Sequence, residues 1–238
     1  AASRALPLPR SMASKAWGRP EMASSALVPS PPPSPTYRVV KWALVTPIFR
    51  LFLRGRCRGM DLVPVNGPLV VVANHGSHLD PPLLGHALPR PVSFMAKAEL
   101  FKIPVIGPLI TAMGAYPVSR GASDREAIRT ALRRLEEGWA TGVFLDGTRK
   151  ASGRVEDPQL GAALLSARSG APLLPVALVN THRAFGPKQR WPRPVAVEIR
   201  VGQPITPPSS RSRADLEATT AECQRAINAL LENPAAPL

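Results

Sequence analysis

The chain has 238 residues, of which 45% are hydrophobic, so it is long enough for one domain with a sizeable core and too apolar to be wholly disordered. Its formal net charge of +14 says nothing about the fold, but it suits anionic partners: nucleic acid, a membrane surface, an acidic carrier protein or a phosphorylated substrate. The two cysteines, Cys57 and Cys223, lie far apart and predict neither a disulfide framework nor a metal site.

No uncharged apolar stretch reaches the roughly 18 residues that a membrane-spanning helix needs. The longest apolar run, residues 39–53, is interrupted by Lys41, Pro47 and Arg50. The sequence is therefore not that of an obvious integral membrane protein, although such a chain can still lie on a membrane surface.

Residues 1–35 are rich in Ala, Ser, Pro and Arg and contain a single acid, Glu21. This composition cannot bury a core, so we expect a disordered tail. It also has the acid-poor, Ser- and Arg-containing character of a transit peptide. The alternative is a wrongly extended start, because Met12 and Met22 can each begin the natural chain.

Residues 36–54 combine apolar side chains with basic ones and predict a helix, kinked or divided at Pro47, that lies on an anionic membrane. The basic residues are Arg38, Lys41, Arg50 and Arg54. The side chains expected to enter the headgroup region are Trp42, Phe49, Leu51, Phe52 and Leu53. The alternative is a helix that packs on the core and exposes a basic stripe.

From Pro68 onward, short runs rich in β-branched residues alternate with helical patterns. The predicted strands are 68–73, 92–96, 115–118, 142–145, 173–179 and 195–201. The predicted helices are 81–88, 124–137, 159–169 and 213–231. This alternation predicts that residues 55–238 form an α/β domain, in which a mixed, mostly parallel central sheet is covered by helices on both faces.

The first group of polar residues is Asn-His-Gly-Ser-His-Leu-Asp at 74–80, directly after the Val-rich strand. His75 at the end of a strand and Asp80 at the start of a helix can fold back into contact. A carboxylate bonded to one imidazole nitrogen fixes the tautomer and leaves the other nitrogen to take a proton. The pair is a candidate general base. The simpler alternative is a turn in which Asp80 only caps the helix.

A metal site is another interpretation of these side chains. Its ligands would be His75, His78, Asp80 and His86, but no second ligand cluster follows and only His182 remains. We therefore expect no metal and no other cofactor, and we expect His78 to be a bystander. Elemental analysis would detect the metallohydrolase that this alternative implies.

The second group is Gly-Val-Phe-Leu-Asp-Gly-Thr-Arg-Lys at 142–150, where a predicted strand runs into a turn. Gly147 lets the backbone approach an anion, Thr148 can donate a hydrogen bond, and Arg149 can bind a phosphate bidentately. A nucleotide-binding phosphate loop needs Lys where Thr148 stands, so nucleotide hydrolysis is disfavoured. An ordinary turn is the alternative.

A third group, residues 114–120, runs from Gly114 to Arg120 and would by itself be a strand ending in a surface arginine. In order and spacing, the three groups resemble the glycerolipid acyltransferase family, especially the lysophosphatidate acyltransferases. That family has an Asn-His-x4-Asp block, a Gly-to-Arg block, a Phe-Pro-Glu-Gly-Thr-Arg block and a later Val/Ile-Pro-Val block. This chain supplies them at 74–80, 114–120, 144–149 and 174–176. The resemblance covers about residues 37–232, and the ordered combination is specific although each block alone is weak.

Three positions depart from the family pattern. Leu145 and Asp146 stand where family members usually have Pro and Glu, so the charge is kept with a shorter reach. Gln159 stands where a Lys is common, which weakens the case that the helix beginning there contacts phosphate.

The resemblance implies an enzyme that transfers a fatty acyl group from acyl-CoA or acyl-carrier protein to the free hydroxyl of 1-acyl-sn-glycerol-3-phosphate, forming phosphatidate. His75 would take the hydroxyl proton while Asp80 orients it, and backbone N–H groups near the 146–147 turn would hold the oxyanion. The acceptor would be bound by Arg120, Asp146, Gly147, Thr148 and Arg149. Among these, Asp146 would orient an arginine or the turn rather than touch the anion.

The implied partners are the acyl donor, a lysophospholipid acceptor and a membrane surface. The enzyme would be peripheral on the cytoplasmic face, or in a plastid if residues 1–35 are a transit peptide.

The same chemistry on glycerol-3-phosphate or another lysophospholipid stays open, as do the donor and the acyl chain length, because pocket shape decides them. A non-catalytic basic protein on membranes is an alternative of another class. Nucleic acid is not expected, because only 5% of residues are aromatic and no nucleic-acid motif is present.

Overall fold

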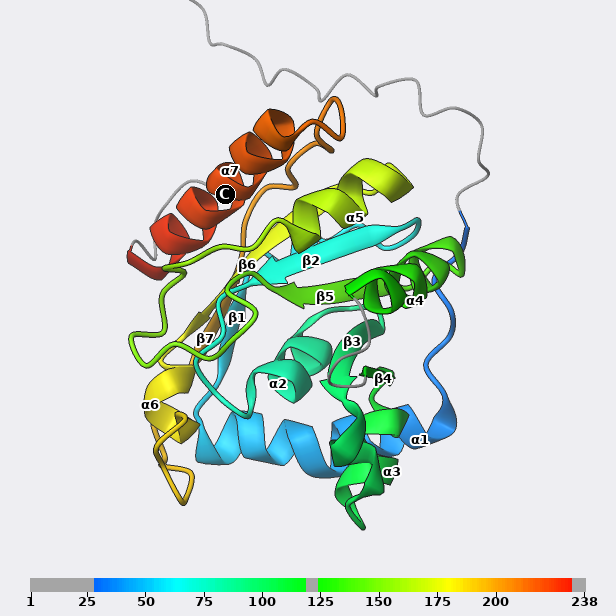
Figure 1. The fold of residues 1–238 in the computed structure, drawn as a ribbon. Coiled ribbons are helices and arrows are strands. Elements are labelled where there is room, and N and C mark those ends of the chain that lie inside the picture. Colours follow the sequence, from blue (N-terminus) through cyan, green and yellow to red (C-terminus); the bar gives the residue numbers. More distant parts are fainter. Residues whose placement is uncertain (1–27, 119–123, 233–238) are drawn as a thin grey trace, which may run out of the picture.

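The computed structural model describes residues 28–118 and 124–232, and within these ranges seven strands form one sheet (Figure 1). The strand order is β1-β7-β6-β2-β5-β3-β4. Strands β6, β2, β5, β3 and β4 are parallel to one another, whereas β7 is antiparallel to β6 and parallel to β1. The predicted α/β fold with a mixed, mostly parallel sheet is confirmed.

Each predicted strand is present, with some ends shifted. The strands are β1 (Arg56–Arg58), β2 (Leu69–Ala73), β3 (Val92–Lys97), β4 (Ala115–Val118), β5 (Ala140–Phe144), β6 (Leu173–Val179) and β7 (Glu198–Val201). Strand β1 is not predicted from the sequence, because its three residues are all exposed and lack an apolar alternation. It is an edge strand that pairs only with β7.

The four predicted helices are also present, as α2, α4, α5 and α7. The α-helices are α1 (Pro35–Val39), α2 (Asp80–Ala87), α3 (Ile106–Ala112), α4 (Asp124–Glu136), α5 (Gly161–Ser169), α6 (Thr181–Phe185) and α7 (Arg213–Glu232). Two π-helical stretches, η1 (Val40–Val45) and η2 (Ile48–Phe52), and two 3₁₀ turns, η3 (Met60–Leu62) and η4 (Ala98–Lys102), complete the helical elements of the described chain. Helices α3 and α6 are too short to give a helical period that sequence patterns can identify.

Strand β2 lies between two hydrophobic cores, because successive side chains of a strand point to opposite faces. Leu69, Val71 and Ala73 pack with the N-terminal helices and α2, whereas Val70 and Val72 pack with α4, α5 and α7. Figure 1 shows α5 and α7 on one side of the sheet and α2 with the N-terminal helices on the other. The carboxyl end of β2 therefore lies between two packed hydrophobic cores.

The N-terminal helices α1, η1 and η2 belong to the core as well as to the surface. Tyr37, Val45, Phe49 and Leu53 are buried in the same core as α2, and the Tyr37 hydroxyl donates a 2.7 Å hydrogen bond to the Gly85 carbonyl. Phe49 and Leu53 are 1% and 0% exposed, so the expectation that these two side chains enter a headgroup layer is wrong.

The opposite side of these helices is exposed and partly apolar. Its exposed large side chains are Val39, Trp42, Leu44, Leu51 and Phe52. Pro47 lies between η1 and η2, and the chain remains helical through this position. Across the described residues, no helix combines the length and the hydropathy needed to cross a membrane.

Of the tail predicted for residues 1–35, residues 1–27 lie outside the described part of the chain. Residues 28–30 run beside 65–67: the Ser30 hydroxyl donates to the Val65 carbonyl at 2.8 Å, and the Gly67 amide donates to the Val28 carbonyl at 3.1 Å. The division of the chain at residues 35 and 54 stays a prediction.

Candidate active site

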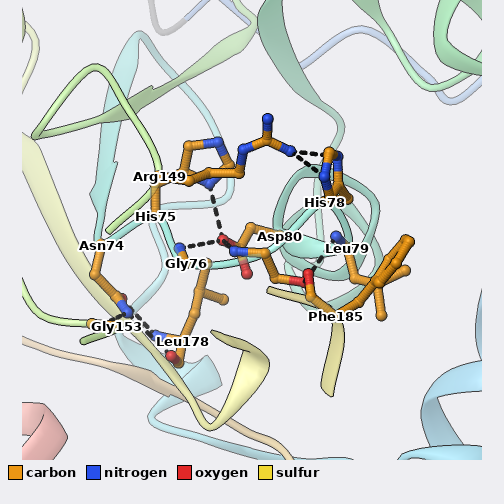
Figure 2. A network of polar contacts seen from close by, with 11 residues as sticks. Asn74, His75, Gly76, His78, Leu79, Asp80, Arg149, Gly153, Leu178 and Phe185 are labelled. Atoms are coloured by element: carbon orange, nitrogen blue, oxygen red, sulfur yellow. Dashed lines mark hydrogen bonds and ion pairs between the residues drawn. The ribbon is translucent and has the colours of Figure 1, made fainter. Parts of the chain in front are cut away.

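His75 and Asp80 are in direct contact at the carboxyl end of β2. The distance from His75 Nδ1 to Asp80 Oδ2 is 2.8 Å. The Asp80 carboxylate is fully buried, whereas 16% of the His75 side chain is exposed. Figure 2 shows a nitrogen of the His75 ring directed at this carboxylate. A buried carboxylate on Nδ1 fixes the imidazole as the tautomer whose Nε2 accepts a proton, which is the geometry of a general base.

Asp80 is held by the loop that it closes. Its Oδ2 also accepts hydrogen bonds from the backbone N–H groups of Gly76 at 2.8 Å and Ser77 at 2.7 Å. Asp80 is the first residue of α2, and Leu79 occupies the cap position without a side-chain cap bond. The alternative in which Asp80 only caps its helix is therefore wrong: the side chain turns back to the preceding loop.

Asn74 clamps the start of this loop to two other segments. Its side-chain amide donates to the carbonyls of Gly153 at 2.7 Å and Leu178 at 3.0 Å, and its Oδ1 accepts from the Leu178 N–H at 2.7 Å. The sequence motif contains Asn74, but pairing over about a hundred positions of chain leaves no periodic signal. Because Asn74 is fully buried, these bonds fix the direction in which the chain leaves β2.

Phe144 at the end of β5 supports the imidazole from the side. The His75 and Phe144 rings are stacked with centroids 4.0 Å apart and an interplanar angle of 14°, and Phe144 stacks in turn on Phe94 of β3 at 5.9 Å. Gly142 makes room for this stack, because a Cβ there would overlap the Phe94 ring. Sequence reasoning did not identify the role of Phe144, since it depends on β2, β5 and β3 lying side by side.

The turn after β5 lies beside His75. The Lys150 N–H donates a 2.8 Å hydrogen bond to the His75 carbonyl, which joins the second group of the sequence to the first. Gly147 has a φ of +66°, a left-handed conformation that favours glycine. The Gly147 N–H donates to the Phe144 carbonyl at 3.0 Å, so this amide is engaged within the turn and does not suit the expected role as an oxyanion donor. The side chains of Thr148 and Arg149 are exposed.

Asp146 points away from this exposed turn. It is buried, and its Oδ1 accepts hydrogen bonds from the backbone N–H groups of Glu156 at 3.0 Å and Asp157 at 2.7 Å. It therefore braces the loop between β5 and α5. Of the two functions that the sequence suggests for Asp146, this arrangement corresponds to orienting the turn.

The Arg149 guanidinium contacts the ring of His78, as Figure 2 shows. Burial, followed by the nearby charges of Arg149 and His75, lowers the pKa of His78 below its usual value, so the neutral ring that can accept from a guanidinium is favoured. The backbone N–H of His78 also donates to the Phe185 carbonyl at 3.3 Å. His78, expected to be a bystander, is thus a direct neighbour of Arg149.

The other histidines lie in separate environments. His86 packs against Phe49 with centroids 5.1 Å apart, and burial, followed by Lys41 and Arg50, lowers its pKa to about 4. Within the described ranges no group of three or more His, Cys, Asp or Glu side chains is arranged to hold a metal ion. Arg120, the remaining candidate site residue, lies outside the described residues.

Comparisons with known proteins agree on one family. The sequence profile of the Acyltransferase family matches residues 54–179. A 1-acyl-sn-glycerol-3-phosphate acyltransferase of Bacillus subtilis is 33% identical over 132 residues, which are 53% of this chain and 64% of that protein. A chloroplastic 1-acyl-sn-glycerol-3-phosphate acyltransferase of Brassica napus is 31% identical over 135 residues, which are 56% of this chain and 39% of that protein.

A solved structure extends the likeness to the fold. The crystal structure of the 1-acyl-sn-glycerophosphate acyltransferase PlsC of Thermotoga maritima superposes with a TM-score of 0.71 at 26% identity and covers 83% of this chain and 80% of that one. The matches to the two sequence relatives above span between 39% and 64% of their own lengths. The family match at residues 54–179 includes the His75 loop and the Gly-Thr-Arg turn.

Proposed function

We propose that this chain, which belongs to the acyltransferase family, transfers a fatty acyl group from an acyl thioester to the free hydroxyl of 1-acyl-sn-glycerol-3-phosphate and so forms phosphatidate. The observation that carries the proposal is the 2.8 Å contact between His75 Nδ1 and the buried Asp80 carboxylate. The names of the similar proteins from Bacillus subtilis, Brassica napus and Thermotoga maritima support the choice of acceptor.

In the proposed reaction, His75 Nε2 removes the proton of the acceptor hydroxyl while Asp80 stabilises the imidazolium that forms. The hydroxyl oxygen attacks the thioester carbonyl, and the tetrahedral intermediate collapses with loss of the thiolate. The imidazolium returns its proton to the thiolate, so atoms and charges balance without an acyl-enzyme. Phe144 holds the ring in place, because a stacked imidazole cannot swing away from Asp80.

The acceptor phosphate would bind at the exposed turn beside His75. The Thr148 hydroxyl and the Arg149 guanidinium are exposed there, and the Lys150–His75 backbone bond keeps the turn at a constant position relative to the base. Arginine suits a phosphate because its planar fork donates two parallel hydrogen bonds. Arg120 is proposed as a second contact on the grounds of its motif alone.

We also propose that residues 36–54 dock the protein on an anionic membrane. The exposed side chains of Trp42, Leu51 and Phe52 are of the type that enters a headgroup layer, and Arg38 and Arg50 are exposed on the same helices. Deleting these helices would strip buried side chains from the core, so point substitutions test the proposal better. Trp42→Ser with Leu51→Ser should reduce binding to vesicles that contain phosphatidate and leave the fold unchanged.

The catalytic proposal is tested with purified protein and lysophosphatidate, with acyl-CoA in one arm and acyl-carrier protein in the other, by following phosphatidate formation. Glycerol-3-phosphate and lysophosphatidylcholine in parallel arms identify the acceptor. His75→Ala is the matched inactive control. If no acceptor is acylated with either donor by a folded protein, the proposed reaction is wrong.

A further inference from the structure

We infer that the loop of residues 186–196, which contains the exposed Trp191, is a second lipid-contact element that binds anionic phospholipid headgroups beside the N-terminal helices. This inference rests on the proposal that the chain works at a membrane surface, and it adds a distinct contact to residues 36–54. The loop follows α6 directly, and Figure 1 shows it at the same end of the molecule as the N-terminal helices.

Trp191 is 79% exposed, although it belongs to a loop with ordered internal hydrogen bonds. The Gln189 side chain accepts from the Gly186 N–H at 3.0 Å and donates to the Arg183 carbonyl at 3.1 Å. The Arg193 N–H donates to the Ala184 carbonyl at 2.7 Å. These bonds hold the backbone of the loop in one shape while its largest apolar side chain stays exposed.

The charge of the loop complements an anionic lipid surface. Lys188, Arg190 and Arg193 are exposed, and residues 186–196 contain no acid. An exposed Trp among exposed basic side chains is the combination that places an aromatic ring at the headgroup level while cations pair with lipid phosphates. A purely electrostatic partner would need the cations alone, whereas the ring requires an interface that is partly apolar.

The loop is continuous with the surface of the N-terminal helices. The Arg54 guanidinium donates to the Pro194 carbonyl at 3.2 Å, and the Val197 N–H donates to the Leu53 carbonyl at 3.1 Å. The exposed Leu51, which is 80% exposed, lies two residues before Leu53. The loop and the N-terminal helices are thus adjacent, and we infer that one bilayer contacts both.

The loop is also tied to the His75 loop. Phe185, the last residue of α6, accepts hydrogen bonds from the Ser77 hydroxyl at 2.9 Å and from the His78 N–H at 3.3 Å. Docking the loop on lipid therefore brings residues 75–80 to the bilayer surface, where a lysophospholipid acceptor lies. The N-terminal helices alone would leave the molecule free to tilt about their axis, and a second contact removes that freedom.

The test compares full-length variants by sedimentation with two kinds of vesicle, phosphatidylcholine alone and phosphatidylcholine mixed with phosphatidate. Trp191→Ser should weaken binding to the mixed vesicles about tenfold, as expected for partial burial of one large apolar side chain. Lys188→Glu with Arg190→Glu should weaken it by at least about twentyfold, because each basic residue near an anionic surface contributes about fivefold. Only the loss of binding caused by Lys188→Glu with Arg190→Glu should become smaller at high salt.

The matched control is Arg168→Glu with Arg225→Glu, which makes the same charge change at exposed positions on α5 and α7, across the sheet. This control should bind the mixed vesicles more strongly than Lys188→Glu with Arg190→Glu does. Trp191→Leu should likewise bind more strongly than Trp191→Ser. Acylation of a short-chain, monomeric acceptor in solution should be equal in all these proteins, since none of the substitutions touches His75 or Arg149. That assay reports on the proposed reaction independently of lipid binding.

The inference is overturned if Trp191→Ser and Lys188→Glu with Arg190→Glu bind the mixed vesicles as well as the unchanged protein does. It is also overturned if the unchanged protein does not bind mixed vesicles. Loss of binding to an acidic acyl-carrier protein, with vesicle binding retained, would also overturn it by assigning the loop to the donor. A selective loss of vesicle binding, together with a lower rate only on vesicle-embedded acceptor, supports it.

Discussion

His75 and His78 stand three residues apart in one loop and have opposite environments. His75 is mostly buried, bonded to a fully buried carboxylate and stacked on Phe144. His78 is exposed, and its ring contacts the exposed guanidinium of Arg149 (Figure 2). The contacts of His75 are with buried or half-buried groups, whereas the contact of His78 joins two exposed side chains.

This difference separates what is fixed before substrate arrives from what can still adjust. The Asp80 carboxylate accepts from Gly76, Ser77 and His75, so the position of the imidazole is determined by the fold. The Arg149 side chain is exposed, and a contact between exposed side chains such as that with His78 contributes little to the free energy of folding. The proposed base is thus preorganised, whereas the arginine can move toward a phosphate at small cost.

Replacing His75, the proposed base, should have the largest effect. We expect His75→Ala to reduce acyl transfer by about 10²–10⁴, the usual contribution of a general base, without unfolding the protein. The measurement is initial rate together with circular dichroism, and His78→Ala serves as the control from the same loop. A folded His75→Ala protein with substantial activity would remove His75 from the mechanism.

Asp80→Asn should lower both the rate and the stability, which distinguishes it from His75→Ala. The Gly76 and Ser77 N–H groups hold an oxygen at the Oδ2 position, so the asparagine offers His75 Nδ1–H a neutral acceptor and no longer stabilises the imidazolium that forms in the reaction. The Gly76 and Ser77 amides also lose a charged acceptor, at about 1.5–3 kcal/mol for each charge-assisted bond. Steady-state kinetics and urea denaturation measure the two losses. Unchanged stability with reduced rate would mean that Asp80 acts on His75 alone.

The sequence predicts most of this fold because the buried strands have a strong local signal. Strand β2 consists of five buried residues, four of them Leu or Val, and it is found within one residue of its predicted start. Strand β1 is missed because Arg56 and Arg58 show no hydrophobic pattern, and its pairing with β7 depends on a segment far along the chain.

The candidate site divides in the same way. The motif spacing predicts which side chains are candidates, and His75 and Asp80 are close in sequence, so a short loop brings them together. The Phe144 stack, the Asn74 clamp and the His78–Arg149 contact each join segments that are far apart in the chain. No local periodicity records such contacts, because they follow from the strand order of the sheet.

Arg149→Ala should have an intermediate effect that is confined to the acceptor. Loss of a charge-assisted phosphate contact, worth about 1.5–3 kcal/mol, should raise the acceptor KM by roughly 10–150-fold and leave the donor KM unchanged. Arg149→Lys should recover part of this loss, since it keeps the charge and not the fork. Arg120→Ala should behave as Arg149→Ala does. If the donor KM rises instead, the arginines bind the phosphates of the donor.

His78→Ala should have the smallest effect, because its contact with Arg149 is at the surface. An exposed pair contributes about 0.2–1 kcal/mol, so the acceptor KM should change by less than about fivefold, and kcat should not change. Partial desolvation of the ring and the nearby positive charges lower the pKa of His78, so the neutral ring that can accept from Arg149 is favoured near pH 7. As the pH falls through this lowered pKa, the ring becomes a cation and the contact is lost.

The difference in acceptor KM between the unchanged protein and His78→Gln should therefore depend on pH in one direction. Glutamine offers an acceptor that does not titrate, so the two proteins should agree near neutral pH and diverge as the pH falls. Adding Arg149→Ala to both should abolish the divergence, because the titrating ring would then have no guanidinium beside it. A divergence that persists without Arg149 would mean that the cation formed at His78 acts directly on the acceptor phosphate, and the exposed histidine would then belong to the binding site itself.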